Sequence, residues 1–410
     1  MLFQNARIEN AAPADFRIEN GLFAGFGASL PPKPGEETVD LGGRLVLPPF
    51  IESHVHLDTC LTAGDPVWNL SGTLFEGIEC WAKRKDKLTK QDIRERVQRA
   101  VRLYASHGVQ FIRTHVDVTD PSLVAMEALL ELREELRDTV ELQVVAFPQE
   151  GILSYPNGKQ LMKDAVRLGA DAVGAIPHFE FTREYSVESL NFAMRLAADN
   201  GLLVDVHCDE IDDEASRGLE TVAARALELE LFDKVTASHT TAMHSYNNAY
   251  VTRLMRLLKM SRINFVSNPL VNTHLQGRMD AYPKRRGVTR VKELTEAGIN
   301  VSFGHDDIFD PWYPMGTGNL RDVVFMGLHV CQMMGYEEIM GAYRFVTTNA
   351  ARTLHLGERY GIAKGRPASF VVLDAGQYYD ALNTNAVVLA SYKNGKKIAQ
   401  AAPASTKVLF

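Results

Sequence analysis

The sequence predicts an α/β protein: a (β/α)₈ barrel of the TIM type with a small β-sandwich domain formed from both chain ends. Three observations lead to this prediction. Buried strand-like runs alternate with amphipathic helical patterns from about residue 46, the alternation yields eight strands, and short strand and turn patterns occupy both chain ends. An open, doubly wound parallel sheet is the competing architecture. No glycine-rich phosphate fingerprint follows the first strand, which disfavours the dinucleotide-binding version of that sheet.

Residues 1–47 are expected to form the N-terminal part of the small domain. Strand-like runs cover residues 3–8 and 16–26, and Asn20-Gly21 between two alternating runs signals a hairpin. This segment is too short to bury a good core by itself. We therefore expect it to pair with the similar strand-like pieces of residues 356–410, which include a run at 369–374.

Residues 48–355 are expected to form the barrel. Helical patterns at 92–103 and 189–197 separate strand-like runs, and a further helix is predicted at 340–352. The predicted strands cover residues 46–56, 110–117, 142–149, 172–179, 202–208, 234–239, 263–269 and 299–307. Strands that alternate with helices build a parallel sheet, and eight of them favour closure.

The composition is that of an ordinary globular protein, with 46% hydrophobic and 23% charged residues. Lys and Arg number 44 against 51 Asp and Glu, and the net charge of -7 argues against nucleic acid or an anionic membrane as partner. We find no secretory signal and no apolar run long enough to cross a bilayer. The four cysteines lie far apart and are expected to be reduced thiols of a cytoplasmic protein.

Polar side chains collect at the predicted carboxyl ends of the strands. His54 and His56 lie one residue apart, so the period-2 alternation of a strand points both to one side. In a (β/α)₈ barrel these ends all meet at one mouth, where active sites form. The residues concerned are His54, His56, Gln149, Glu150, His207, Glu210, His239, Asp306 and Asp307. Each has an ordinary structural explanation when taken singly, but the joint placement predicts a metal site.

One divalent metal ion, Zn²⁺ or Fe²⁺, is the predicted cofactor, because imidazole and carboxylate suit both and no cysteine cluster is present. Its predicted ligands are His54, His56, His207 and Asp306. His239 is expected to contact a water on the metal, whose acidity the metal raises. The predicted strand at 172–179 contains no lysine, so a bridging carboxylated lysine and a second metal are disfavoured.

Glu210 follows His207 by three residues and is expected to act as a proton shuttle beside the activated water. The alternative is a solvated surface carboxylate, because residues 210–214 form an acidic run. The catalytic interpretation is favoured, since this run starts at the barrel mouth.

Several other residues keep two interpretations. Trp68 and Trp81 could line the pocket, although helix packing explains Trp81 equally well. His115 and His178 face either the mouth or the core. The basic run at 282–287 is interpreted as a solvated loop in preference to an anion or subunit contact.

Taken together, these motifs resemble the amidohydrolase superfamily, and more narrowly its bacterial cytosine deaminases. The resemblance covers nearly the whole chain and rests on His54-Val55-His56, Phe147-Pro148-Gln149-Glu150-Gly151, His207-Cys208-Asp209-Glu210, Ala237-Ser238-His239 and Gly304-His305-Asp306-Asp307. Residues 71–79, 176–185 and 309–314 are also similar to that family. The sequence departs from it at the short C-terminus and at Ala368-Ser369, where many members carry Ala-Asp.

The resemblance implies a hydrolase acting on C–N bonds in cyclic amidines, with a mononuclear iron site that also accepts zinc. The implied reaction is the deamination of cytosine to uracil and ammonia, a step of pyrimidine salvage, by attack of metal-bound hydroxide at C4. Glu210 protonates N3, and Asp306 passes the water proton to the leaving amino group, while His239 contacts the water.

The same resemblance implies the substrate contacts. Gln149 holds the O2/N1 edge of the pyrimidine, and Asp307 and Trp312 shape the pocket, with Leu74 nearby. Cytosine is the expected small-molecule partner. We also expect a homo-oligomer, with a hexamer as one form.

Three other functions remain open. A related deaminase could act on isoguanine or creatinine. A ring-amide hydrolase is disfavoured by the missing lysine and the presence of Glu210. A non-catalytic metal-binding barrel is disfavoured because every ligand and proton shuttle is present.

Overall fold

Eight parallel strands form the barrel of the computed structural model, which describes residues 1–409. In chain order they are β6 (Phe50–Val55), β7 (Val109–Asp117), β8 (Glu141–Phe147), β9 (Ala172–Ala175), β10 (Leu203–Cys208), β11 (Val235–His239), β12 (Asn264–Ser267) and β13 (Val301–Phe303). Each pairs in parallel with the next strand along the chain. The predicted (β/α)₈ architecture is confirmed, and the open doubly wound sheet is excluded.

The barrel closes where β6 meets the segment after β13. Val55 and Asp306 form a parallel bridge. The Asp306 amide donates to the His54 carbonyl over 2.9 Å, and the His56 amide donates to the Asp306 carbonyl over 3.2 Å. Closure of the barrel therefore brings the His54/His56 strand end directly against Asp306.

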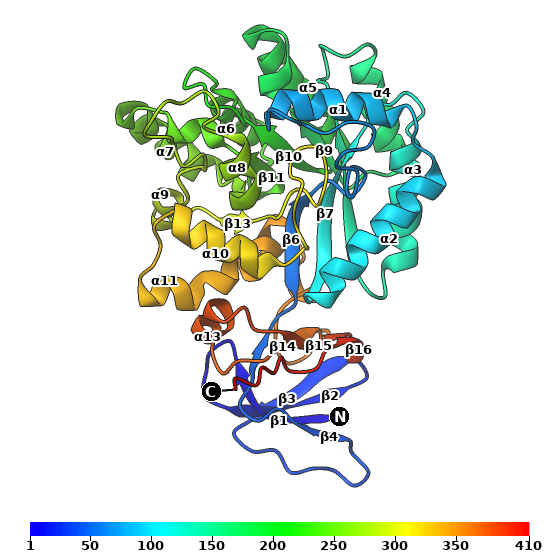
Figure 1. Ribbon diagram of the computed structural model, residues 1–410, viewed down its shortest axis with the longest axis vertical. Coiled ribbons are helices and arrows are strands. Elements are labelled where there is room, and N and C mark those ends of the chain that lie inside the picture. The colour runs from blue at the N-terminus through cyan, green and yellow to red at the C-terminus, as the bar shows by residue number, and fades with distance from the viewer. Residues whose placement is uncertain (410) are drawn as a thin grey trace.

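Helices cover the outside of the barrel, as Figure 1 shows. They are α1 (Leu74–Lys85), α2 (Lys90–Ser106), α3 (Val124–Leu136), α4 (Gly158–Leu168), α5 (Arg183–Asn200), α6 (Gly218–Glu228), α7 (Asn248–Ser261), α8 (Pro269–Leu275), α9 (Val291–Glu296), α10 (Leu320–Val330), α11 (Tyr336–Gly341) and α12 (Thr348–Thr353). Helix α2 shows why they form. Thr89 caps its first turn, and Ile93, Val97 and Ala100 recur at helical spacing on the buried face. The predicted helices at 92–103 and 189–197 lie within α2 and α5.

Prolines shorten several predicted strands. The run at 46–56 is two strands, β5 (Leu45–Leu47) and β6, separated by Pro48-Pro49. The strand at 172–179 ends at Ala175 because Pro177 begins the 3₁₀ turn η1 (Pro177–Phe179). The strand at 263–269 ends at Ser267 because Pro269 opens α8. The single helix predicted at 340–352 is wrong: the short helices α11 and α12 flank the 3₁₀ turn η4 (Ala342–Val346).

Both chain ends contribute to a separate β domain beneath the barrel (Figure 1). Its strands are β1 (Leu2–Ile8), β2 (Ala14–Glu19), β3 (Leu22–Gly27), β4 (Thr38–Asp40), β5, β14 (Phe370–Leu373), β15 (Val388–Lys393) and β16 (Lys396–Gln400), with helix α13 (Tyr378–Asn383) beside them. Strand β5 pairs with β1 and with β14, and so joins the N-terminal strands to the C-terminal ones. The predicted pairing of the chain ends is confirmed, as is the Asn20-Gly21 hairpin between β2 and β3.

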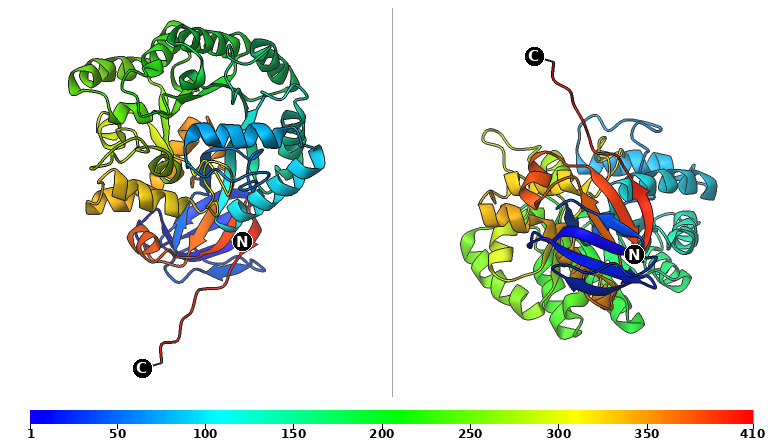
Figure 2. Two further views of the ribbon diagram at one scale, coloured as in Figure 1. Left: turned by 45° about the horizontal axis from the view of Figure 1, so that its top comes forward. Right: turned by 90° about the horizontal axis from the view of Figure 1, so that it is seen from below.

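Aromatic packing holds the two parts of this domain together. The Phe3 ring stacks on Phe16 with centroids 4.8 Å apart and meets the edge of Phe370 at 5.2 Å. Figure 2 shows the small domain from below, with the last residues extending away from it. Within residues 1–409, no helix is both long and apolar enough to span a membrane.

Candidate active site

Four imidazoles converge at the carboxyl-end mouth of the barrel. His54 Nε2 lies 3.2 Å from His207 Nε2 and 3.2 Å from His239 Nε2, and His56 Nε2 lies 2.9 Å from His207 Nε2. The Asp306 Oδ1 atom is 3.5 Å from His54 Nε2 and 3.6 Å from His56 Nε2. All five side chains are buried. The structure thus brings together every residue that the sequence suggested for a metal and its water.

This donor set fits a single divalent ion. Ligands about 2.1 Å from a tetrahedral metal stand roughly 3.4 Å from one another, which is close to the separations between these atoms. Burial lowers the pKa of His54, His56 and His207 well below the usual range, and the neighbouring imidazoles act in the same direction. The neutral imidazole is the form that ligates a metal, so these three histidines are in the protonation state that metal binding requires.

A buried chain of hydrogen bonds fixes the orientation of His54. Its Nδ1 atom lies 3.0 Å from the Ser238 hydroxyl, which donates to Asp205 over 2.5 Å. Arg113 donates to the other Asp205 oxygen over 2.8 Å. With Asp205 accepting from Ser238, the serine oxygen is free to accept from Nδ1–H. The Nε2 lone pair of His54 then faces the cluster.

Glu210 and Asp306 both approach Nδ1 of His239. His239 Nδ1 lies 3.1 Å from Glu210 Oε1 and 3.7 Å from Asp306 Oδ2. Burial acts to lower the pKa of His239, but the two carboxylates outweigh burial and the net pKa is raised. The Asn272 amide lies 3.0 Å from the same Nδ1 atom. Two carboxylates and an imidazole that can exchange protons therefore lie next to the cluster of possible metal ligands.

Left-handed backbone conformations occur where the site residues leave their strands. His239 has φ = 65°, Asp306 has φ = 71° and Asp209 has φ = 51°. Such conformations are costly for residues other than glycine, and they cluster at functional sites. The barrel-closing hydrogen bonds hold Asp306 in place, and side-chain contacts hold Asp209.

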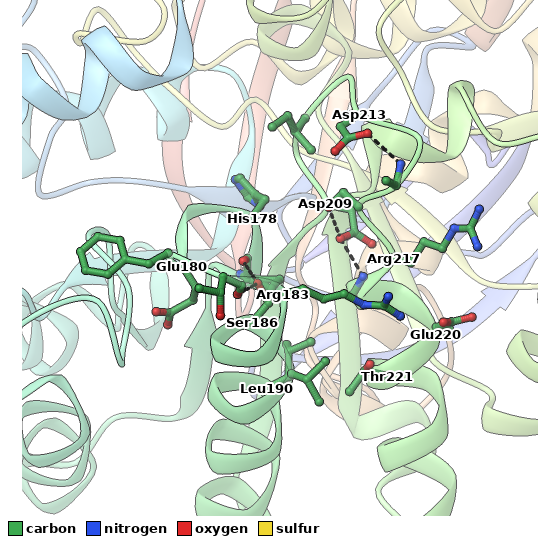
Figure 3. A pocket seen from close by; sticks show the side chains of 18 residues that line it. His178, Glu180, Arg183, Ser186, Leu190, Asp209, Asp213, Arg217, Glu220 and Thr221 are labelled. Carbon is green, nitrogen blue, oxygen red and sulfur yellow. Dashed lines mark hydrogen bonds between the residues drawn. The ribbon is translucent and has the colours of Figure 1, made fainter.

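Asp209 fixes the loop that carries Glu210. Its carboxylate accepts from the amides of Gly218 and Leu219, over 2.9 Å and 2.8 Å, at the start of α6. Figure 3 shows Asp209 pointing toward that helix from the wall of an open surface groove. His178, on the same wall, accepts from the Glu210 amide over 3.3 Å. His178 thus supports the Glu210 backbone, and the groove lies beside the site instead of forming it.

A small cavity adjoins the histidines. It is lined by His56, Leu74, Gln149, Ile176, His207, Glu210, His239, Leu275, Asp306, Asp307 and Trp312. Every residue predicted to contact substrate is among them. Its lining combines polar and ionisable groups with the side chains of Leu74, Ile176, Leu275 and Trp312, which suits a flat ring with a polar edge.

Trp312 and the first turn of α1 form one wall of this cavity. The indole Nε1 of Trp312 donates to the Leu74 carbonyl over 3.2 Å. A Cβ atom on Gly77 would lie 2.5 Å from the indole ring, so the glycine lets the helix approach. Asp310 accepts from the Trp312 amide over 3.0 Å. Burial, together with the carboxylates of Asp306 and Asp310, raises the pKa of Asp307 well above its usual range.

Several site-supporting residues were missed from the sequence. Glu52 is buried and accepts from the amides of His54 and His305, each over 3.0 Å, and burial raises its pKa to about 8. Its position two residues before His54 places it on the same strand face, a signal that was available. Asp58 and Asp117 were also missed, although Asp58 follows β6 and Asp117 ends β7. Asn272 could not have been found, because it lies on helix α8 after a strand that ends early.

Other candidates take structural roles. Glu150 pairs with Lys85 and does not line the cavity. Trp68 is half exposed, whereas Trp81 is fully buried. His115 packs under His54 with ring centroids 4.0 Å apart. In the basic run, Arg285 pairs with Asp280 of its own loop over 2.6 Å.

A closed (β/α)₈ barrel with four histidines and a carboxylate around one point at its mouth defines the class of this protein: a barrel hydrolase whose site can hold a metal ion. The chain belongs to the amidohydrolase family, whose family model matches residues 37–399. The resemblance noted in the sequence is therefore confirmed.

Solved structures and curated relatives agree with this membership. The 5-methylcytosine deaminase of Klebsiella pneumoniae, liganded with 5-fluorocytosine, is 50% identical, with a TM-score of 0.97 over 100% of this chain and 99% of that one. The N-isopropylammelide isopropylaminohydrolase of Burkholderia multivorans is 26% identical, with a TM-score of 0.85 over 97% and 98%. The pterin deaminase of Rhizobium rhizogenes is 27% identical over 98% of this chain and 91% of its own length.

Proposed function

We propose that this protein catalyses the hydrolytic deamination of cytosine-type pyrimidines, converting cytosine to uracil and ammonia and acting also on 5-methylcytosine. One observation carries the proposal. A single small cavity joins Gln149 and Glu210 to the cluster of histidines and Asp306. The similarity to a 5-methylcytosine deaminase supports the same substrate class.

We propose one divalent ion, Fe²⁺ or Zn²⁺, held by His54, His56, His207 and Asp306. When bound, such an ion supplies a water that ionises near neutral pH. The protein's own residues supply recognition and proton transfer.

Gln149 recognises the polar edge of the ring. A primary amide can donate to the O2 carbonyl and accept from N1–H at the same time, which a carboxylate or a hydrocarbon side chain cannot do. Leu74 and Trp312 cover the ring and exclude bulk water, which strengthens the polar contacts inside.

Glu210 and Asp306 carry the two protons of the attacking water. Glu210 delivers one to N3, and Asp306 delivers the other to the leaving amino group through Oδ2, the oxygen that faces His239. His239, whose Nδ1 atom faces both carboxylates, holds the water oxygen. The C4–O bond forms first, while N3 is protonated, and the C4–N bond then breaks as the C4 carbonyl forms, so cytosine and water give uracil and ammonia.

Ammonia release from the metal-loaded protein tests this function. We expect ammonia release from cytosine and 5-methylcytosine and little from isoguanine or creatinine, and no ring opening of dihydropyrimidines, which releases no ammonia and is followed by ultraviolet absorbance. Turnover of one of those compounds without turnover of either pyrimidine would overturn the proposal. A protein that binds metal but turns over none of these compounds would support the non-catalytic alternative.

A further inference from the structure

Asp117, at the carboxyl end of β7, has no role in the function proposed above, yet it contacts three segments of the chain beside the cavity. It is buried, and both of its carboxylate oxygens accept hydrogen bonds. We propose that Asp117 is a positioning residue for substrate recognition: it holds the backbone of Gln149 and helix α1 in one fixed relation. This inference rests on the proposed function and deepens it.

The first contact is with the Gln149 segment. Asp117 Oδ1 accepts from the Gln149 amide over 3.3 Å. The same oxygen accepts from the amide and the hydroxyl of Thr119, over 2.7 Å and 2.5 Å. The main chain that carries the Gln149 side chain is therefore tied to the end of β7.

The second contact is with helix α1. Asp117 Oδ2 accepts from the Trp81 indole over 2.9 Å, and Lys85 Nζ lies 3.8 Å from the same oxygen. Trp81 packs in an apolar cluster with Leu275 and Trp312, both of which line the cavity. The contacts with Asp117 hold the last two turns of α1 in place. The first turn of the helix, which carries Leu74, is thereby held against the cavity.

The third contact ties Asp117 to the strand that carries His54 and His56. The Asp117 amide donates to Asp58 Oδ2 over 2.8 Å, and Asp58 follows His56 by two residues. Asp117 thus contacts the segment that follows His54 and His56, the Gln149 segment and helix α1. It touches none of the proposed metal ligands through its own side chain.

An amide cannot replace this carboxylate. Both oxygens face donors only: Trp81 and Lys85 on one side, Thr119 and Gln149 on the other. Asparagine has one acceptor oxygen and one NH₂ group, so one side must place donor against donor. Asp117→Asn should therefore loosen either α1 or the Gln149 segment while its volume stays the same.

The experiment compares Asp117→Asn with two other variants. Trp81→Phe removes the indole N–H that bonds Asp117 and reduces the packing of α1, but leaves the contact between Asp117 and the Gln149 amide in place. Asp171→Asn is the control, because Asp171 also accepts from both a side chain (Arg133) and a backbone amide (Val144), but at the opposite end of the barrel. Each variant is measured for KM and kcat on cytosine, for metal affinity by chelator competition, and for amide hydrogen exchange of residues 74–85 and 147–151.

We expect Asp117→Asn to raise KM roughly ten- to hundredfold, with kcat changed less and metal affinity unchanged, and to speed exchange in at least one of the two segments. Trp81→Phe should raise KM less and speed exchange in 74–85 alone. Asp171→Asn should leave KM and both segments as in the wild type. An equal KM in Asp117→Asn and Asp171→Asn, or unchanged exchange in both segments, would overturn the inference. Absence of wild-type turnover would instead refute the proposed function, and the exchange data would still decide the role of Asp117.

Discussion

The Ser238 hydroxyl lies 3.0 Å from Nδ1 of His54 and donates its proton to Asp205. The serine oxygen can then only accept from the imidazole, so His54 is held with its proton on Nδ1 and with Nε2 free to bind a metal. A ligand oriented in this way costs less to order when the ion binds.

Ser238→Ala should lower metal affinity roughly ten- to hundredfold, because Nδ1 of His54 loses its partner and the imidazole loses its fixed tautomer. Competition with a chromogenic chelator measures the change. Ser302→Ala is the control, since Ser302 is a buried serine on β13 whose hydroxyl bonds the Phe265 carbonyl and Thr353. Equal affinities in the two variants would show that the Ser238 bond does not orient the ligand.

Glu210→Gln should keep its metal and lose roughly 10²- to 10⁴-fold in kcat, because glutamine cannot transfer a proton to the ring. Metal analysis and ammonia release on the same sample separate the two effects. Asp213→Asn, an exposed carboxylate on the same loop, should leave both unchanged. A fall in metal content in Glu210→Gln would mean that Glu210 is a ligand.

Gly77→Ala should raise KM for cytosine at least several-fold, because the new methyl group would lie 2.5 Å from the Trp312 ring and must displace it. Gly25→Ala is the control, since an added Cβ there meets no atom of residues 1–409 within 4 Å. Steady-state kinetics tests both variants. If the tryptophan fluorescence spectrum of Gly77→Ala shifts while KM is unchanged, the result would argue against a role of Trp312 in the substrate pocket.

Stability should fall between about pH 6.5 and pH 4, in part because of His107. Burial, reinforced by Arg321, lowers the pKa of His107 to about 4. As the pH drops below 6.5, the unfolded chain binds a proton at this residue and the native state does not, so unfolding becomes easier. His107→Gln should therefore flatten the decline of Tm between pH 7 and pH 5.

The exposed residue His329 provides the control for that measurement, because His329→Gln should retain the wild-type decline. Thermal melts at four or five pH values are sufficient. A steeper decline in His107→Gln than in the wild type would reverse the sign of the argument.

The fold and most of the candidate site were predictable because both depend on local patterns. Strand and helix periodicity revealed eight repeats, and the rule that strand ends of a barrel meet at one mouth placed His54, His207 and Asp306 together before any coordinates were known. Apart from the single helix predicted at 340–352, the errors were at strand ends. Pro177 and Pro269 end their strands earlier than the hydrophobic pattern suggests, because proline cannot donate to a sheet.

The supporting residues were harder to predict, because their roles depend on neighbours far away in the chain. In the sequence, Asp117 has the pattern of an ordinary strand residue. Only the folded chain shows that its carboxylate bonds both Trp81 and Gln149, which are 36 and 32 residues away. Trp81 itself could be assigned to the pocket or to helix packing, and its bond to Asp117 makes it a buried support of the cavity wall.

Residue types and spacing in the sequence were thus enough to establish a barrel with histidines and carboxylates at its mouth, since these follow from periodicity and from ligand chemistry. Tertiary structure was needed to show that Nε2 atoms of four histidines face one point, that Glu210 faces His239, and that α1 covers the cavity. The reason is physical. Side-chain direction and hydrogen-bond partners depend on closure of the barrel and on loop packing. Both bring together segments that are far apart in the chain, and no local sequence pattern relates such segments.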